Sequence, residues 1–172
     1  LASILGAVVA LDPLQASAAS VTFTVNSLAD TSDASAGNGT CATAAAVCTL
    51  RAAIEEANAG SAANTYTINV SVAGTMQMGS TALPILVRSI TIDGSTAPGY
   101  AAATGPTFIL RCNGSDVSSN DGLSASAANI TIRALQIVNC STAVITSSQA
   151  TGLKVVGSYL GSDGNAFSAA KA

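Results

Sequence analysis

Short segments of alternating apolar and polar residues occur along the chain and predict β-strands. The clearest is 21–25, Val-Thr-Phe-Thr-Val, in which every second side chain is apolar. Further apolar segments predict strands at 65–72, 85–92, 107–112, 129–138 and 152–160. Residues 29–40 are rich in Asp, Ser, Gly and Asn and predict a loop after the first strand.

One segment, 50–58, has the periodicity of a helix. Its apolar residues fall at positions i, i+3, i+4 and i+7 and form one stripe: Leu50, Ala53, Ile54 and Ala57. We expect Thr49 to cap the helix and Gly60 to end it, with Arg51 and Glu55 forming an i,i+4 pair. Because a helix this short is marginally stable alone, it must pack against the rest of the protein.

Two predicted strands read as copies of one unit. Residues 128–137 align with 151–160 at an offset of 23 residues. The apolar positions coincide in this alignment: Ile130 with Leu153, Ile132 with Val155, and Ile137 with Leu160. A repeat of roughly this length is typical of a β-solenoid, in which each coil stacks its aliphatic side chains on the previous coil. A β-sandwich remains an alternative, since it has strands at a similar density.

The composition fits one folded domain. The chain has 172 residues, 49% of them hydrophobic, and those are mostly small aliphatic residues. Six Lys and Arg against nine Asp and Glu leave a net charge of −3, so no cationic face for nucleic acid is expected. Disordered chains are poorer in apolar residues and richer in charge than this one.

The cysteines indicate an oxidising compartment. There are four, Cys41, Cys48, Cys112 and Cys140, and no His, which favours disulfides over a zinc site. We therefore expect a secreted or cell-surface protein. Five Asn-x-Ser/Thr triplets are possible N-glycosylation sites, although a Ser/Thr-rich chain contains several by chance: Asn38, Asn69, Asn113, Asn129 and Asn139.

The first eleven residues form an uncharged apolar segment. It is too short for a transmembrane helix, which needs about 20 residues. We expect residues 1–20 to be a retained hydrophobic arm, or else the remnant of a signal peptide that ends near Ala16-Ser17-Ala18, and 21–172 to be a single domain. The arm carries five aliphatic side chains that must be buried somewhere: Ile4, Leu5, Val8, Val9 and Leu11.

Three segments resemble one family of secreted proteins. Residues 48–54, Cys-Thr-Leu-Arg-Ala-Ala-Ile, resemble the Cys-Ser-Leu-Arg-Glu-Ala-Ile motif of many bacterial and archaeal parallel β-helix proteins. Residues 90–100 (ITIDGSTAPGY) and 156–163 (VGSYLGSD) are similar to two later motifs of that family, and the three occur in the family's order. Ala52 stands where the motif has Glu, and the loop before Cys41 lacks the usual Asp-Gly, which puts an inherited acidic or metal-binding role in doubt.

The resemblance implies a fold. It predicts an all-β protein, a short right-handed parallel β-helix (solenoid) with one N-terminal capping α-helix and an N-terminal hydrophobic arm. The helix would cover the first coil, because a solenoid end otherwise leaves a sheet edge and core exposed. Residues 161–172 show no amphipathic pattern that would close the other end.

On this fold the cysteines are expected to pair as Cys41–Cys48 and Cys112–Cys140. The first pair would staple the start of the helix, and the second would join two stacked strands, whose separation suits a disulfide. Free buried thiols are the alternative.

Candidate chemistry is sparse. Asp30 and Asp33, in the loop that also holds Asn38, form a weak calcium candidate, although turn formation explains the same residues more simply. We expect no cofactor. A nucleophile activated by His is excluded, and the acids are too scattered for a polysaccharide-lyase-like enzyme, which is the most remote alternative.

The sequence therefore predicts a structural protein and no enzyme. We expect an extracellular subunit that assembles with copies of itself into a filament or layer by stacking of solenoid ends and donation of the N-terminal arm as a strand. The alternative is the N-terminal module of a longer adhesin or carbohydrate-binding surface protein, with surface glycans as partners.

Overall fold

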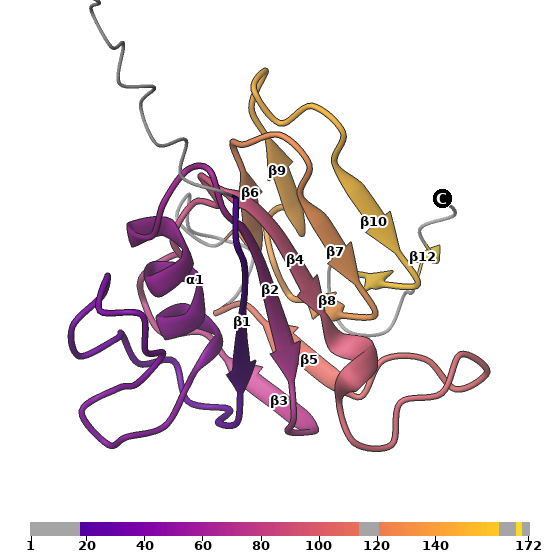
Figure 1. Ribbon diagram of the computed structural model, residues 1–172. Coiled ribbons are helices and arrows are strands. Elements are labelled where there is room, and N and C mark those ends of the chain that lie inside the picture. Colours follow the sequence, from indigo (N-terminus) through magenta and orange to yellow (C-terminus); the bar gives the residue numbers. More distant parts are fainter. Residues whose placement is uncertain (1–17, 114–120, 162–167, 170–172) are drawn as a thin grey trace, which may run out of the picture.

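Parallel strands form three sheets (Figure 1). The computed structural model describes residues 18–113, 121–161 and 168–169. The first sheet contains β1 (Ser20–Val25), β2 (Thr65–Val70), β4 (Ser89–Asp93), β7 (Thr131–Arg133) and β10 (Lys154–Val156), in that order. The second contains β3 (Gly74–Gln77), β5 (Phe108–Arg111), β8 (Gln136–Val138), β11 (Tyr159–Leu160) and β12 (Ser168–Ala169). The third consists of β6 (Leu123–Ala125) and β9 (Val144–Thr146).

The chain visits the sheets in turn and then returns to the first one. We call each such round of strands a layer, so neighbouring strands in a sheet come from successive layers. The first layer contains β1, and the second contains β2 and β3. The third contains β4, β5 and β6, and the fourth contains β7, β8 and β9. The last described layer contains β10 and β11. Every pair of these strands is parallel, and only β12 runs antiparallel to its neighbour. The prediction of an all-β protein with parallel strands is confirmed, whereas a β-sandwich is built from antiparallel strands.

Inward-facing side chains lie in rows that cross the layers. In the first sheet one row consists of Phe23, Ile68, Ile92, Ile132 and Val155. In the second sheet a row consists of Met76, Leu110, Ile137 and Leu160. The rows belong to one contiguous hydrophobic core. Each fully buried aliphatic side chain in such a row contributes about 1.5–3 kcal/mol to the folded state.

The 23-residue repeat is confirmed in the strand register. Ile132 pairs with Val155 and Ile137 pairs with Leu160, which are the positions that the sequence alignment matched. The backbone repeats as well, because Ala134 and Gly157 both have positive φ, 51° and 58°. These left-handed residues turn the chain from the first sheet into the second. Each predicted strand, 129–138 and 152–160, is therefore two strands.

The corner between these two sheets is tightly stacked. A Cβ atom at Gly94, directly after β4, would lie 2.2 Å from the carbonyl oxygen of Ala134 in the next layer. Only glycine fits this close approach of two backbones. The short 3-10 helix η1 (Gly94–Thr96) follows at this corner.

Some strand predictions were wrong. Of the predicted strand 85–92, only the part from Ser89 onward is a strand, and Leu86 makes an isolated parallel bridge to Ala125. The reason is Asn58, whose side chain donates to the Ile85 carbonyl (2.7 Å) and accepts from the Val87 amide (3.1 Å). Four short strands, β3, β6, β9 and β12, were not predicted.

The predicted helix is present as α1 (Leu50–Ala59) and packs against β1 and β2. Thr49 caps it by accepting a hydrogen bond from the Ala52 amide at 3.1 Å, as expected. Gly60 ends it, and its amide donates to the carbonyls of Glu56 and Ala57. The apolar stripe of α1 is fully buried in the core.

Candidate functional site

The two ends of the stack differ and define the candidate site. We call the first the helix end, formed by α1 and the loop 26–49, and the second the distal end, formed by β9, β10 and β11. At the helix end Leu50 and Ile54 are completely buried and cover the core beneath β1 and β2.

Arg51 holds the helix end together through a buried network. Its guanidinium donates to both carboxylate oxygens of Asp30, at 2.7 and 3.0 Å, and both side chains are only 8% exposed. It also donates to the carbonyls of Thr81 (2.9 Å) and Ala82 (2.8 Å). Asp30 in turn accepts from the Gly79 amide. Arg51 therefore ties the helix to two separate loops.

The two glutamates of α1 hold the loop 26–49 from the other side. The predicted Arg51–Glu55 pair is wrong, because Glu55 accepts a hydrogen bond from the Asp33 amide at 2.7 Å instead. Glu56 is buried and its carboxylate accepts from the amides of Gly37 and Gly39. A buried carboxylate needs such donors, because an unpaired buried charge is strongly destabilising.

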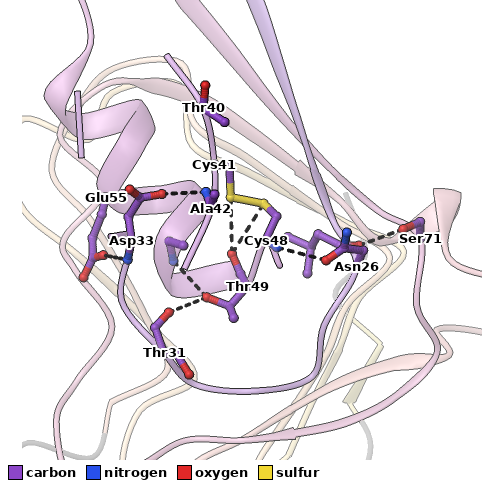
Figure 2. The surroundings of a disulfide bond; sticks show 12 residues. Asn26, Thr31, Asp33, Thr40, Cys41, Ala42, Cys48, Thr49, Glu55 and Ser71 are labelled. Carbon is purple, nitrogen blue, oxygen red and sulfur yellow. Dashed lines mark hydrogen bonds between the residues drawn. A yellow bond between two sulfur atoms is a disulfide. The ribbon is translucent and has the colours of Figure 1, made fainter. Parts of the chain in front are cut away.

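The predicted disulfide Cys41–Cys48 lies where this loop enters the helix (Figure 2). Its Cα atoms are 5.2 Å apart, an ordinary disulfide separation. The Cys48 amide donates to the side chain of Asn26 at 2.9 Å, and the Thr49 hydroxyl donates to the Thr31 carbonyl at 2.6 Å. The start of α1 is thus fixed to the segment that follows β1.

The calcium candidates have other roles. The carboxylate of Asp33 accepts from the amides of Ser35 (2.8 Å) and Ala42 (2.9 Å), so it closes turns within the loop. Both oxygens of Asp30 accept from Arg51. Within the described ranges, no three side chains of the His, Cys, Asp or Glu type are gathered to hold a metal ion.

Within the described residues, the last side chains of the hydrophobic rows at the distal end are only partly covered. Leu153, Val155 and Leu160 pack on the core but stay half-buried, whereas the residues beneath them, such as Ile132 and Ile137, are completely buried. A hollow of ≈ 190 Å³ opens here between Cys140, Ser141, Ala143, Leu160 and Gly161. Another apolar layer would bury these side chains.

Two strand edges also end at this face. The amide of Lys154 and the carbonyl of Val156 bond to the layer beneath, so the alternate groups, those of Val155, point outward. β10 and β9 are the last strands of their sheets within the described residues. The second sheet differs, because β12 pairs antiparallel with β11 and so covers part of this edge, although the sequence of 161–172 shows no amphipathic pattern.

The second predicted disulfide, Cys112–Cys140, is also present. Its Cα atoms are 4.9 Å apart, and it links the third layer to the fourth just after β5 and β8. Both cysteines are buried, at 0% and 4% exposure.

The sequons lie in different environments. Asn38 is exposed in the loop at the helix end, and Asn69 is half-buried within β2. Asn113 and Asn129 are exposed beside strands, and Asn139 is half-buried and donates to the Cys112 carbonyl at 3.1 Å. The arm residues Ile4, Leu5, Val8, Val9 and Leu11 lie outside the described residues.

Comparisons of the chain with models of protein families, with curated proteins and with solved structures each find no match. Within the described part of the chain, no helix is long and apolar enough to span a membrane. Sequence reasoning did not single out Asn26, Glu56 or Asn58. No sequence pattern marks these residues, because each bonds to groups that are distant in the chain: Asn26 to Cys48, Glu56 to Gly37 and Gly39, and Asn58 to Ile85 and Val87.

Proposed function

We propose that this chain is an extracellular structural protein, wound as a short right-handed parallel β-helix, that assembles with copies of itself through its distal end. The passage of the chain through successive sheets supports the winding, because each strand lies parallel to its counterpart one layer before. Right-handed crossovers are the rule for parallel strands in one sheet. The resemblance of residues 48–54 to the motif of secreted β-helix proteins agrees with this winding.

The difference between the two ends carries the proposal. The helix end is covered by α1 and held by Arg51, Glu56 and a disulfide. The distal end leaves Leu153, Val155 and Leu160 half-buried, beside the outer edges of β9 and β10. Apolar surface next to an unpaired strand edge favours the addition of another strand.

We propose that the added strand is the apolar segment 1–11 of a neighbouring copy. The segment is long enough to pair along β10, and its aliphatic side chains would continue the inward row that ends at Val155. A contact between the N-terminus of one copy and the distal end of the next is heterologous, so it propagates into a filament. The two disulfides are compatible with an extracellular location.

A structural role also agrees with the bonding of the acidic side chains. Asp30, Asp33, Glu55 and Glu56 all accept hydrogen bonds from the backbone or from Arg51. The Oδ2 atom of Asp93 lies 3.4 Å from the Nη1 atom of Arg133. These carboxylates hold loops and corners in place, and we propose no catalytic role for them.

Deletion of residues 1–14 tests the donated strand. Purified full-length chain is expected to form filaments visible by electron microscopy, whereas the truncated chain is expected to sediment as a folded monomer. Circular dichroism of the truncated chain checks that the sheets are retained. If the truncated chain forms the same filaments, the donated strand is refuted.

A longer protein is the second candidate. The half-buried side chains of Val155 and Leu160, which end two different rows, would equally be covered by a further layer of the same chain. The protein would then be the N-terminal module of an adhesin or a carbohydrate-binding surface protein. The mass of the deglycosylated protein from its natural source separates the two, since a polypeptide mass well above 16.7 kDa favours the module.

A further inference from the structure

The loop at the helix end presents one asparagine outward between two fixed glycines. The amides of Gly37 and Gly39 both donate to Glu56, whose carboxylate is buried beneath the loop. Asn38 lies between them and is exposed, as are its neighbours from residue 36 to 40. Because both flanking amides point inward to Glu56, the loop is held from its inner side and its outer side remains accessible.

The side chain of Asn38 is itself ordered by the loop. Its Oδ1 atom accepts a hydrogen bond from the Thr40 amide at 2.7 Å, which is an Asx turn. Since Oδ1 is the atom engaged by the backbone, Nδ2 is the part of the amide directed away from this contact. Asn38, Gly39 and Thr40 together form an Asn-x-Thr sequon.

The other sequons that are described in full are tied into the layers. Asn69 lies in β2, paired with Thr24 on one side and Asp93 on the other. In the Asn129 sequon, the Ile130 carbonyl accepts from the Lys154 amide and Thr131 pairs with strands on both sides. An enzyme that must enclose a sequon would have to open a sheet to reach either one.

Asn139 is restrained in another way. Its Nδ2 atom, the atom that glycosylation modifies, donates to the Cys112 carbonyl, and Cys140 of the same sequon forms a buried disulfide. The third residue of the Asn113 sequon, Ser115, lies outside the described residues. Among the four sequons described in full, that of Asn38 is therefore the one whose three residues are all exposed.

We propose that Asn38 carries an N-linked glycan and that the helix end is the glycosylated end of the protein. The donor would be an oligosaccharide on a lipid pyrophosphate, and the catalyst an oligosaccharyltransferase of the secretory route. Nδ2 forms a bond to the anomeric carbon of the first sugar, the bond from that carbon to the pyrophosphate oxygen breaks, and the Nδ2 proton is lost. The lipid pyrophosphate is the leaving group.

The location of the glycan has a consequence for the surface of the protein. A glycan is bulky and hydrophilic, so it shields the surface around its attachment point. At Asn38 it would cover the loop over α1 and leave the distal end free, because that end is formed by the last layers instead. The proposal does not rest on self-assembly, and Asn38→Gln is expected to leave the assembly state unchanged.

Secretion of the chain from cells that perform N-glycosylation tests the proposal. Intact mass and peptide mapping before and after enzymatic deglycosylation are expected to find the glycan at Asn38. Asn38→Gln and Thr40→Val should each abolish it, whereas Thr40→Ser, which preserves the sequon, and Asn129→Gln, the matched control at an exposed site, should retain it.

Two results would overturn the proposal. One is a secreted wild-type chain, with both disulfides formed, in which Asn38 is unmodified. The other is a glycan found mainly at Asn69, Asn129 or Asn139, which would mean that accessibility in the folded layers does not select the acceptor.

Discussion

At the scale of single residues, polar side chains fix both the start of α1 and its contacts with the neighbouring loops. The capping of α1 by Thr49 and its end at Gly60 follow from neighbours within one turn, and both are confirmed. The partner of Arg51 was not predicted correctly, because Asp30 lies 21 residues earlier and an i,i+4 glutamate was nearer in sequence. In the folded protein Arg51 and Asp30 are buried together, and the Arg51 guanidinium also reaches the carbonyls of two loop residues. An exposed pair with Glu55 would not bring these groups together.

The Arg51 network gives the first prediction. Arg51→Met leaves the Asp30 carboxylate buried without its partner, and breaking a buried pair in this way costs about 3–5 kcal/mol of unfolding free energy. Urea denaturation followed by circular dichroism measures the change. Arg133→Met is the matched control, because its pair with Asp93 is 52% exposed at Arg133 and an exposed pair contributes under about 1 kcal/mol. Equal losses in the two variants would contradict the assigned role of Arg51.

At the scale of elements, long or repeated patterns were recognised and very short strands were missed. The helix stripe and the 23-residue repeat match α1 and the register of β10 on β7 and of β11 on β8. β6 and β9 are three residues each, which is too short for an alternating pattern to stand out. The corner at Ala134 was missed because a positive φ is usually marked by glycine, whereas here an alanine adopts it.

The two disulfides give the second prediction. Cys41–Cys48 closes a loop with a sequence separation of 7, and Cys112–Cys140 one of 28. The loss of loop entropy in the unfolded chain then stabilises the folded state by about 2 kcal/mol for the first disulfide and by about 3–4 kcal/mol for the second. Replacing each pair by alanines should therefore lower the urea midpoint more for Cys112 and Cys140. A larger loss for the shorter loop would show that anchoring of the helix end, and not loop closure, dominates the stability.

At the scale of the whole molecule, the sequence predicted a β-rich chain with two disulfides and a helix over one end, and it missed the polar contacts and the short strand that complete the two ends. At the helix end, Asn26 and Glu56 hold the loop 26–49 and Asn58 holds residues 85–87; none of the three shows a pattern in the sequence. β12 pairs antiparallel through only two residues, Ser168 and Ala169, which no periodicity predicts. A difference between a helix-covered end and a less covered distal end was expected from the sequence, and the stacked layers show which residues stay half-buried there: Leu153, Val155 and Leu160.

One pair of substitutions in β10 tests the central claim, assembly through the distal end. Val155 and Val156 are both half-buried and adjacent, but Val155 continues the inward row of Ile132, whereas Val156 lies beside Arg133 on the outer face. Val155→Lys places a charge on the surface that an added strand must cover, and Val156→Lys places the same charge outside it. Sedimentation velocity is expected to find filaments for the wild type and Val156→Lys, and a folded monomer for Val155→Lys. Filaments of Val155→Lys equal to those of the wild type would contradict the account.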